Sequence, residues 1–265
     1  MLFPAAIGGF FSLGKMGSNA IKDFMHHWYK GQLHNQATIT LSLNDPALLY
    51  GATVFTTLRV YEQNLDHPLT QWQDHCQRLQ ASLHAFAWEQ PHWEQVREGA
   101  AQLSRQFPVL RITIFPDGRE WITGRQFPSD LAQKQMIGIT AWLASHGTYQ
   151  RSFPEHKTGN YLSSWLALQT AKAKGAQEAI LTDENGNWLE TSTGNLWGWK
   201  DGIWWTPPVE EALSGIARSR ILSFLKTQKI PVQEVIWTPQ FVKTLQALGY
   251  SNCVVQVIPI HTVIT

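Results

Sequence analysis

The first half of the chain alternates between short apolar runs typical of strands and two longer stretches with helical periodicity. The strand-type runs are rich in β-branched residues or alternate between apolar and polar side chains. Expected strands cover residues 37–43, 54–61, 110–115 and 120–123, with a hairpin at 28–33, and expected helices cover residues 69–86 and 93–106. The pattern predicts a small α+β domain.

The second half begins with a predicted strand, after which residues 144–155 lack periodicity and form a candidate linker. Four short apolar runs are joined so tightly that we expect them to pair as antiparallel neighbours. The expected strands cover residues 137–143, 179–182, 187–191, 195–199, 203–206, 232–237 and 251–259, and the expected helices cover residues 162–174, 215–228 and 241–248. The predicted domains are therefore a small one over residues 26–145 and a larger one over residues 146–265.

Residues 1–25 precede the first hairpin signal and are interpreted as an extension of unclear role. Their first 14 residues are apolar but contain Pro4, Gly8 and Gly9 and lack a basic start. This run is shorter than the roughly 20 residues that a membrane-spanning helix requires. Met16 and Met25 are both plausible alternative starts.

The charge balance argues against nucleic acid or a membrane surface as a partner. The chain has 21 basic and 20 acidic residues, with no strongly basic stripe or acidic tail. Its two cysteines, Cys76 and Cys253, lie far apart and match neither a disulfide framework nor a metal site. A reducing cytoplasm and a small-molecule substrate are expected.

Tryptophan is frequent in this chain, at 13 residues, and four of them lie within residues 197–205. A binding platform is one interpretation of this cluster. Aromatic residues are also common cross-strand partners on a half-buried hairpin, and this second interpretation is favoured.

Three segments carry candidate chemistry, although each alone has an ordinary structural explanation. Lys157 lies in a polar loop before a predicted helix, where most lysines are merely solvated. Glu190 lies at the end of a predicted strand, and Gly215 lies where a predicted helix begins. Their order and spacing make them informative as a set.

Together these segments resemble the class IV aminotransferase family, which contains branched-chain transaminases, D-amino-acid transaminases and 4-amino-4-deoxychorismate lyases. The matching stretches read His-Lys-Thr-Gly-Asn-Tyr-Leu at 156–162, Leu-Glu-Thr-Ser-Thr-Gly-Asn-Leu at 189–196 and Leu-Ser-Gly-Ile-Ala-Arg at 213–218. The resemblance extends over about residues 28–260. It implies a two-domain, fold-type IV α+β protein with a β-barrel-like larger domain, pyridoxal 5′-phosphate (PLP) as the cofactor, and a homodimer.

The resemblance assigns roles to residues that would hold PLP. Lys157 would bind the cofactor's aldehyde covalently and later move a proton, and Glu190 would keep the ring nitrogen protonated. Arg78, in His-Cys-Gln-Arg-Leu at 75–79, would bind the phosphate, and Tyr161 would line the site. The remaining predicted phosphate contacts are Gly215, Ile216 and Ala217 at a helix start and Asn252 and Cys253 on the last strand.

The substrate side is predicted from the segment at residues 50–59, which contains Tyr50, Thr56 and Arg59. It departs from the family by having Ala-Thr at 52–53 where Asp-Gly is usual, which alters the expected turn. Arg111 and Arg119 are candidates to bind substrate carboxylates, because a guanidinium can donate two parallel hydrogen bonds to one.

The sequence Phe-Thr-Thr-Leu-Arg at 55–59 resembles that of the lyases more than that of the transaminases, which often have glutamate after the phenylalanine. The favoured function is therefore 4-amino-4-deoxychorismate lyase, which eliminates pyruvate to give 4-aminobenzoate for folate synthesis. A branched-chain or D-amino-acid transaminase is the first alternative. A catalytically silent PLP-fold binding protein is the second.

Overall fold

The computed structural model describes residues 26–144 and 148–265, which form two compact units. The N-terminal unit comprises described residues up to Pro128 together with His156–Asn160. The C-terminal unit comprises the described parts of Ser129–Glu155 together with Tyr161–Thr265. The extension predicted over residues 1–25 lies outside the described residues.

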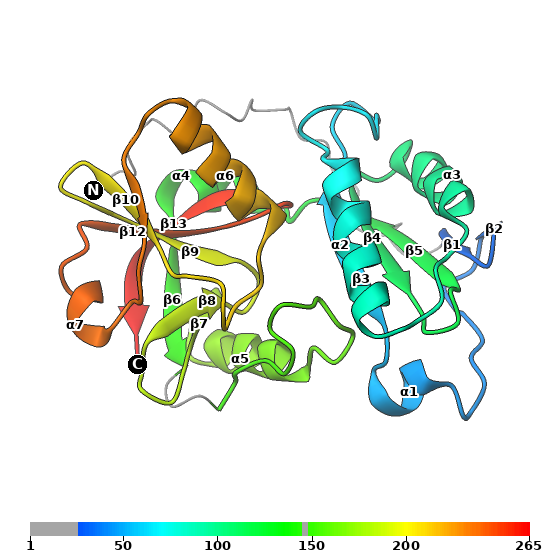
Figure 1. The fold of residues 1–265 in the computed structure, drawn as a ribbon, viewed down its shortest axis with the longest axis horizontal. Helices are drawn as coiled ribbons and strands as arrows, with labels where there is room; N and C mark the ends of the chain where they lie inside the picture. The colour runs from blue at the N-terminus through cyan, green and yellow to red at the C-terminus, as the bar shows by residue number, and fades with distance from the viewer. Residues whose placement is uncertain (1–25, 145–147) are drawn as a thin grey trace. The chain divides into compact units, whose positions relative to one another are not determined.

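The N-terminal unit is built on a five-stranded antiparallel sheet in the order β2-β1-β5-β4-β3 (Figure 1). The predicted hairpin is present, and its turn residues Lys30 and Gly31 have φ of 51° and 72°, as this tight turn requires. The elements of this unit are β1 (His27–Tyr29), β2 (Gln32–His34), α1 (Pro46–Tyr50), β3 (Val54–Arg59), α2 (Trp72–Ala85), α3 (Trp93–Ser104), β4 (Val109–Ile114) and β5 (Glu120–Arg125).

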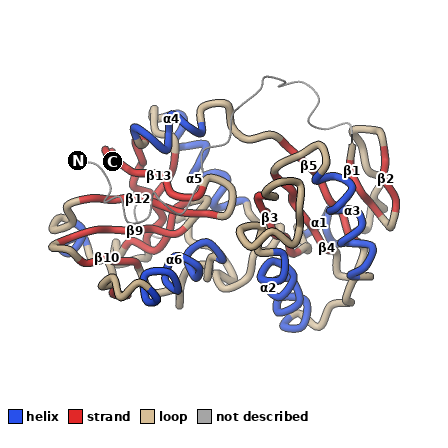
Figure 2. Tube along the Cα trace, turned by 90° about the horizontal axis from the view of Figure 1, so that it is seen from above, coloured by secondary structure: helices blue, strands red, loops and turns tan. Residues whose placement is uncertain are grey.

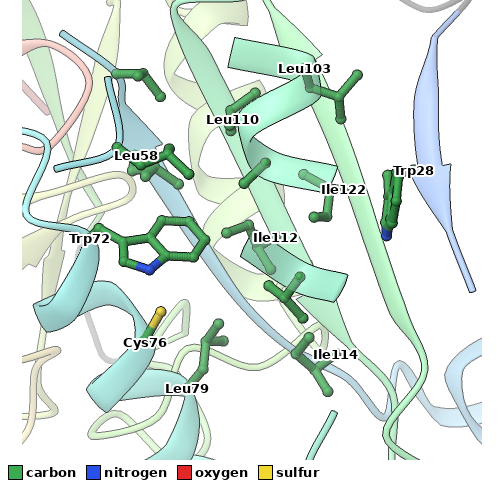
Figure 3. Close-up of a cluster of buried hydrophobic side chains, with 14 of the residues drawn as sticks. Trp28, Leu58, Trp72, Cys76, Leu79, Leu103, Leu110, Ile112, Ile114 and Ile122 are labelled. Atoms are coloured by element: carbon green, nitrogen blue, oxygen red, sulfur yellow. The ribbon is translucent and has the colours of Figure 1, made fainter. Parts of the chain in front are cut away.

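Helices α2 and α3 cover one face of this sheet and enclose the core of the unit (Figure 3). Alternate residues of the strands, such as Leu58 and Ile112, face the helices and are buried. Leu79 and Leu103 meet them from α2 and α3. The odd-numbered residues of β3 therefore point to the opposite face, which matters for the site below.

The C-terminal unit contains an eight-stranded sheet in the order β11-β10-β9-β12-β13-β6-β7-β8. Its neighbouring strands β10, β9, β12 and β13 are labelled in Figure 2. Helix α5 packs on β6 and β7, and α6 packs on β11 and β12. The strands are β6 (Ile139–Ala144), β7 (Glu178–Thr182), β8 (Trp188–Thr191), β9 (Asn195–Lys200), β10 (Ile203–Thr206), β11 (Val232–Glu234), β12 (Ala247–Asn252) and β13 (Gln256–Ile264). The helices are α4 (Leu131–Ile137), α5 (Leu162–Ala173), α6 (Ile216–Thr227) and α7 (Pro239–Val242).

None of the helices in residues 26–144 and 148–265 combines the length and the apolar character needed to cross a membrane.

The predicted boundary near residue 145 differs from the structure, which divides the units after Pro128. Strand β6 pairs in parallel with both β7 and β13, so it belongs to the C-terminal sheet. The chain then returns briefly to the N-terminal unit at residues 156–160. A strand's partners decide its domain, and those partners are distant in sequence.

Several predicted elements are wrong in detail. Residues 37–43 form no strand, and the helix expected at 241–248 is the shorter α7, after which β12 begins. The strand expected at 251–259 is two strands joined by a turn. The expected antiparallel series is interrupted because β9 pairs with β10 and β12, whereas β8 pairs with β7. Short apolar runs do not reveal which neighbour will complete their hydrogen bonds.

The tryptophan cluster has the structural role favoured above. Trp204 lies opposite Trp199 on the β9–β10 hairpin, and Trp197 and Trp204 are almost fully buried against α6. These side chains therefore form the core beneath α6 rather than an exposed platform.

We predict that Gly99→Ala destabilises the protein, although alanine normally favours a helix interior. A Cβ at position 99 would overlap the buried indole ring of Trp28. Overpacking of this kind costs about 1–3 kcal/mol, more than the 0.5–1 kcal/mol that alanine gains over glycine in helices. Urea unfolding of this variant measures the difference, with Gln102→Ala at a partly exposed position of the same helix as control. A stabilised Gly99→Ala would contradict this packing.

Candidate active site

Lys157 is placed by strand β3, although the two are distant in sequence. The backbone N–H of Phe55 donates to the Lys157 carbonyl at 2.8 Å, and the N–H of Gly159 donates to the Thr53 carbonyl at 2.6 Å. Between these bonds, Val54 and Thr158 form an antiparallel bridge. The segment thus extends the sheet at β3 and holds the lysine backbone there.

The amine of Lys157 lies beside an aromatic ring and a second cation. Its Nζ is 4.8 Å from the centroid of the Phe55 ring, and the guanidinium carbon of Arg111 is 3.6 Å from the same centroid. Arg111 lies directly opposite Thr57 in the register of β3 and β4, so it shares the face of Phe55. Of the two predicted carboxylate-binding arginines, Arg111 is therefore the one that contacts the same ring as the lysine.

Thr56 faces the other side of β3, toward α2. It is completely buried, and its Oγ1 lies 2.5 Å from Nη2 of Arg78 and 2.6 Å from Nδ1 of His75. The predicted phosphate-binding arginine is therefore held by a residue that was predicted to contact substrate.

Arg119 is engaged by neighbouring carboxylates. It donates to Asp45 at 2.7 Å, to Asp117 at 2.6 Å and to the hydroxyl of Tyr29 at 2.9 Å. Its hydrogen bonds to these groups raise its pKa above the ordinary value, against the opposing effect of burial. With two carboxylates beside it, Arg119 is poorly suited to attract a third.

Arg59 contacts aromatic rings, and Tyr50 is exposed to solvent. The Arg59 guanidinium lies over the rings of Tyr61 and Phe127, at 4.7 and 4.5 Å from their centroids. Tyr50 ends helix α1, and 74% of its surface is exposed. Their roles toward substrate stay predictions.

In the C-terminal unit, Glu190 is a buried carboxylate held by a buried arginine. Its Oε1 accepts from Nε of Arg151 at 2.8 Å, and its Oε2 accepts from the backbone N–H of Leu213 at 3.2 Å. Sequence reasoning missed Arg151 because it lies in the aperiodic stretch that was interpreted as a linker. The only available signal was a lone arginine six positions before Lys157.

Tyr161 lies close to this ion pair, at the N-cap of α5. Its hydroxyl donates to the backbone carbonyl of Ser192 at 2.8 Å. Burial raises the pKa of Tyr161 to about 12, and the Glu190 carboxylate contributes to the increase. The phenol is therefore protonated at neutral pH.

Glu178 is a second buried carboxylate in this unit. It accepts from the Ser192 hydroxyl, from Oγ1 of Thr193 at 2.5 Å and from the N–H of Ala179 at 2.9 Å. Burial raises its pKa, and these donors oppose that effect. Glu178 therefore anchors the turn that follows Glu190, a role that its position in an apolar run did not predict.

Helix α6 begins with unpaired backbone donors, as an anion site requires. Gly215 is its N-cap, and no side chain caps the helix. The amides of Ile216 and Ala217 lie in the first turn, where N–H groups have no partner within the helix. A Cβ at position 215 would overlap the side-chain oxygen of Asn195, so glycine allows a close approach.

The last predicted phosphate contacts, Asn252 and Cys253, lie at the end of β12. The Asn252 side chain is used locally, because its oxygen accepts from the N–H groups of Val254 and Val255 and its nitrogen donates to the Thr193 carbonyl. Cys253 is half-buried. The side chain of Ser251 is bound by the Trp197 indole, which leaves Cys253 or the backbone as the predicted contact.

Comparison with known proteins identifies the family. The model of the class IV aminotransferases matches residues 53–263. The chain therefore belongs to the class IV aminotransferase family, whose members are PLP-dependent enzymes.

Curated relatives cover most of the chain. A branched-chain-amino-acid aminotransferase of Pseudomonas aeruginosa is 27% identical over 260 residues, covering 89% of this chain and 84% of the relative. An aminodeoxychorismate lyase of Vibrio harveyi is 24% identical over 213 residues, covering 74% of this chain and 77% of the relative. The family thus includes relatives with both chemistries.

Solved structures confirm the predicted fold-type IV architecture. A branched-chain amino acid aminotransferase of Escherichia coli superimposes with a TM-score of 0.78 at 25% identity, covering 90% of this chain and 86% of that one. The T.th. branched-chain aminotransferase, complexed with N-(5′-phosphopyridoxyl)-L-glutamate, has a TM-score of 0.76 at 22% identity, covering 90% and 85%.

The charges and hydrogen-bond donors of the predicted site residues match the chemical groups of PLP. The N-terminal unit provides an amine for the aldehyde and a guanidinium for the phosphate, and the Nε2 of buried His75 has no partner among the described residues. The C-terminal unit provides a buried carboxylate for the ring nitrogen and a helix start for the phosphate. Each unit therefore contains complementary groups for a phosphorylated, basic ring.

We predict that Gly159→Ala prevents PLP from attaching at Lys157. A Cβ at position 159 would overlap the Thr53 side chain and lie 2.7 Å from the Gly51 carbonyl, so the segment would have to leave β3. Borohydride treatment followed by peptide mapping should label Lys157 in the parent and much less in the variant. Gly175→Ala, which meets no neighbour within 4 Å, is the control for a glycine at a helix end. If Lys157 is labelled as strongly in Gly159→Ala as in the parent, glycine at position 159 is not needed to place the lysine.

We predict that Glu190→Gln retains PLP but reacts about 10- to 100-fold more slowly, because the amide cannot hold a proton on the ring nitrogen by charge. The variant should also unfold more easily, since Arg151 loses its buried partner. Glu234→Gln is the matched control, because Glu234 is bound by buried Arg218 at 2.5 Å. The control should lose stability and keep its turnover rate. Parental turnover in Glu190→Gln would exclude the role.

Proposed function

We propose that the protein is a cytoplasmic, PLP-dependent 4-amino-4-deoxychorismate lyase that releases pyruvate and 4-aminobenzoate. The observation that carries this proposal is that Arg111 and Lys157 both contact the Phe55 ring, with the guanidinium carbon 3.6 Å and Nζ 4.8 Å from its centroid. The substrate carries carboxylates, and a guanidinium next to the reacting amine would bind one of them. The hydroxyl residues Thr56 and Thr57 after Phe55, where transaminases often have glutamate, also favour the lyase.

The proposed chemistry requires the chain to move one proton and hold the substrate ring. When bound, the cofactor would supply an electron-withdrawing ring that stabilises negative charge on the substrate. Lys157 would remove the proton from C4, and expulsion of the enolpyruvyl oxygen would follow as the ring becomes aromatic. Glu190 would preserve the positive charge of the cofactor's ring nitrogen, and Tyr161 would act as a neutral hydrogen-bond donor.

The second candidate is a branched-chain or D-amino-acid transaminase. It is favoured by the branched-chain aminotransferases among the relatives that cover most of the chain. A transaminase would use the same lysine to remove the proton but would return it to the cofactor. That pathway leaves the amino group on the cofactor and needs a keto acid to reset it.

We also propose that the protein acts as a homodimer. Helix α5 carries an apolar stripe at positions three and four residues apart, formed by Leu162, Trp165 and Leu166, which are 61%, 54% and 41% exposed. Exposed apolar groups of this size usually mark an interaction surface.

The test is the formation of 4-aminobenzoate from aminodeoxychorismate over many turnovers without a keto acid. The lyase should give sustained product formation, and Lys157→Gln should give none. Arg111→Lys should raise KM more than it lowers kcat, because lysine cannot bind a carboxylate with two parallel bonds. If branched-chain or D-amino acids turn over with a keto acid while aminodeoxychorismate does not, the transaminase replaces the lyase.

A further inference from the structure

The hydroxyl of Thr56 lies between two residues of the same face of α2. Its Oγ1 is 2.5 Å from Nη2 of Arg78 and 2.6 Å from Nδ1 of His75. His75 and Arg78 are three positions apart, which places both side chains on the face that packs against β3. Thr56 and His75 are 0% and 1% exposed, so bulk solvent does not reach their hydrogen bonds.

The direction of these hydrogen bonds follows from counting protons. A guanidinium can only donate, so Oγ1 of Thr56 accepts from Arg78. If Thr56 donates its single proton to Nδ1, only Nε2–H of His75 lacks a partner. If Nδ1 instead donates to Thr56, both the hydroxyl proton and the Nε2 lone pair are left without partners. Because a buried unsatisfied group is costly, the first arrangement is favoured.

Electrostatics also favour a neutral His75. Burial lowers its pKa well below the ordinary value, and the positive charges of Arg78 and Lys157 lower it further. Neutral His75 can accept the Thr56 proton at Nδ1, whereas the imidazolium cannot. The chain of bonds therefore runs from Arg78 to Thr56 to His75 in one direction.

We propose that Thr56 and His75 are positioning residues that hold the Arg78 guanidinium in the orientation in which it binds the phosphate of the cofactor. This inference rests on the proposed PLP-dependent function and on the predicted role of Arg78 in binding the phosphate. Thr56 fixes one nitrogen of the guanidinium, and His75 fixes the Thr56 hydroxyl. Thr56 therefore acts on the cofactor through Arg78 and does not contact the substrate.

The experiment compares the affinities of the full-length protein for PLP and for pyridoxal, which lacks the phosphate. The dissociation constant for pyridoxal divided by that for PLP isolates the contribution of the phosphate, and a smaller ratio means weaker phosphate binding. Thr56→Val removes the hydroxyl with little change of shape and should reduce this ratio about 10-fold, within the range of one hydrogen bond to a charged group. Thr56→Ser should retain the parental ratio, and His75→Phe should reduce it less than Thr56→Val.

Thr70→Val is the matched control, because Thr70 is a buried threonine of the same unit whose hydroxyl is bonded to Asn64 and Tyr61. It should lose stability without changing the ratio of the pyridoxal dissociation constant to the PLP dissociation constant. A parental ratio in Thr56→Val, alongside a reduced ratio in Arg78→Ala, would overturn the positioning role. Equal losses of PLP and pyridoxal affinity in Thr56→Val would also overturn it.

Nitrogen NMR of labelled histidine tests the same inference without any variant. His75 should be neutral at neutral pH, with its proton on Nε2 and not on Nδ1. A protonated Nδ1 would overturn the proposal even if Thr56→Val fails to fold. A parental ratio in Arg78→Ala would overturn it too, while borohydride labelling of Lys157 would show separately whether the proposed function stands.

Discussion

Two backbone hydrogen bonds between β3 and residues 157–159 determine where the candidate reacting lysine lies. They belong to a segment that leaves the C-terminal unit, pairs briefly with β3 and returns. The close approach requires Gly159, because any side chain there would meet Thr53. Since β3 also carries Phe55 and Thr56 on opposite faces, one strand arranges the lysine, Arg111 and Arg78 together.

The charged groups predicted to contact the cofactor have different partners in the two units. In the C-terminal unit, Glu190 is paired with Arg151, and Glu178 is held by hydroxyl and amide donors. In the N-terminal unit, Arg78 is oriented by a neutral hydroxyl. A carboxylate at position 56 would compensate the Arg78 charge, whereas threonine directs the guanidinium without neutralising it. A carboxylate at Glu190 suits its predicted role of keeping the ring nitrogen of the cofactor protonated. A positive charge at Arg78 suits its predicted role of attracting the phosphate.

The same scaffold supports elimination and amino transfer because both begin with removal of a proton by one lysine. Relatives with both chemistries cover most of this chain. The groups that would distinguish the two reactions contact the substrate and not the cofactor. Arg111, which is proposed to bind a substrate carboxylate, is therefore the residue most relevant to the choice between them. Arg119 and Arg59 lie elsewhere, bonded to carboxylates or stacked on aromatic rings.

The amino-acid sequence by itself determined the longer helices, the first hairpin, the β9–β10 hairpin and the family. Helical periodicity extends over many residues, tight turns have specific residue requirements, and the motifs around Lys157, Glu190 and Gly215 occur in a characteristic order. These are local signals, which act between residues close together in the chain.

Only the tertiary structure decided the strand partners, the boundary after Pro128 and the neighbours of each candidate residue. Arg151 lies in an aperiodic loop, so nothing local predicted its pairing with Glu190. Thr56 was predicted to contact substrate, yet the register of β3 turns its hydroxyl toward α2. Successive strand residues point to opposite faces, and which face meets a helix or the reacting lysine is set by contacts distant in sequence.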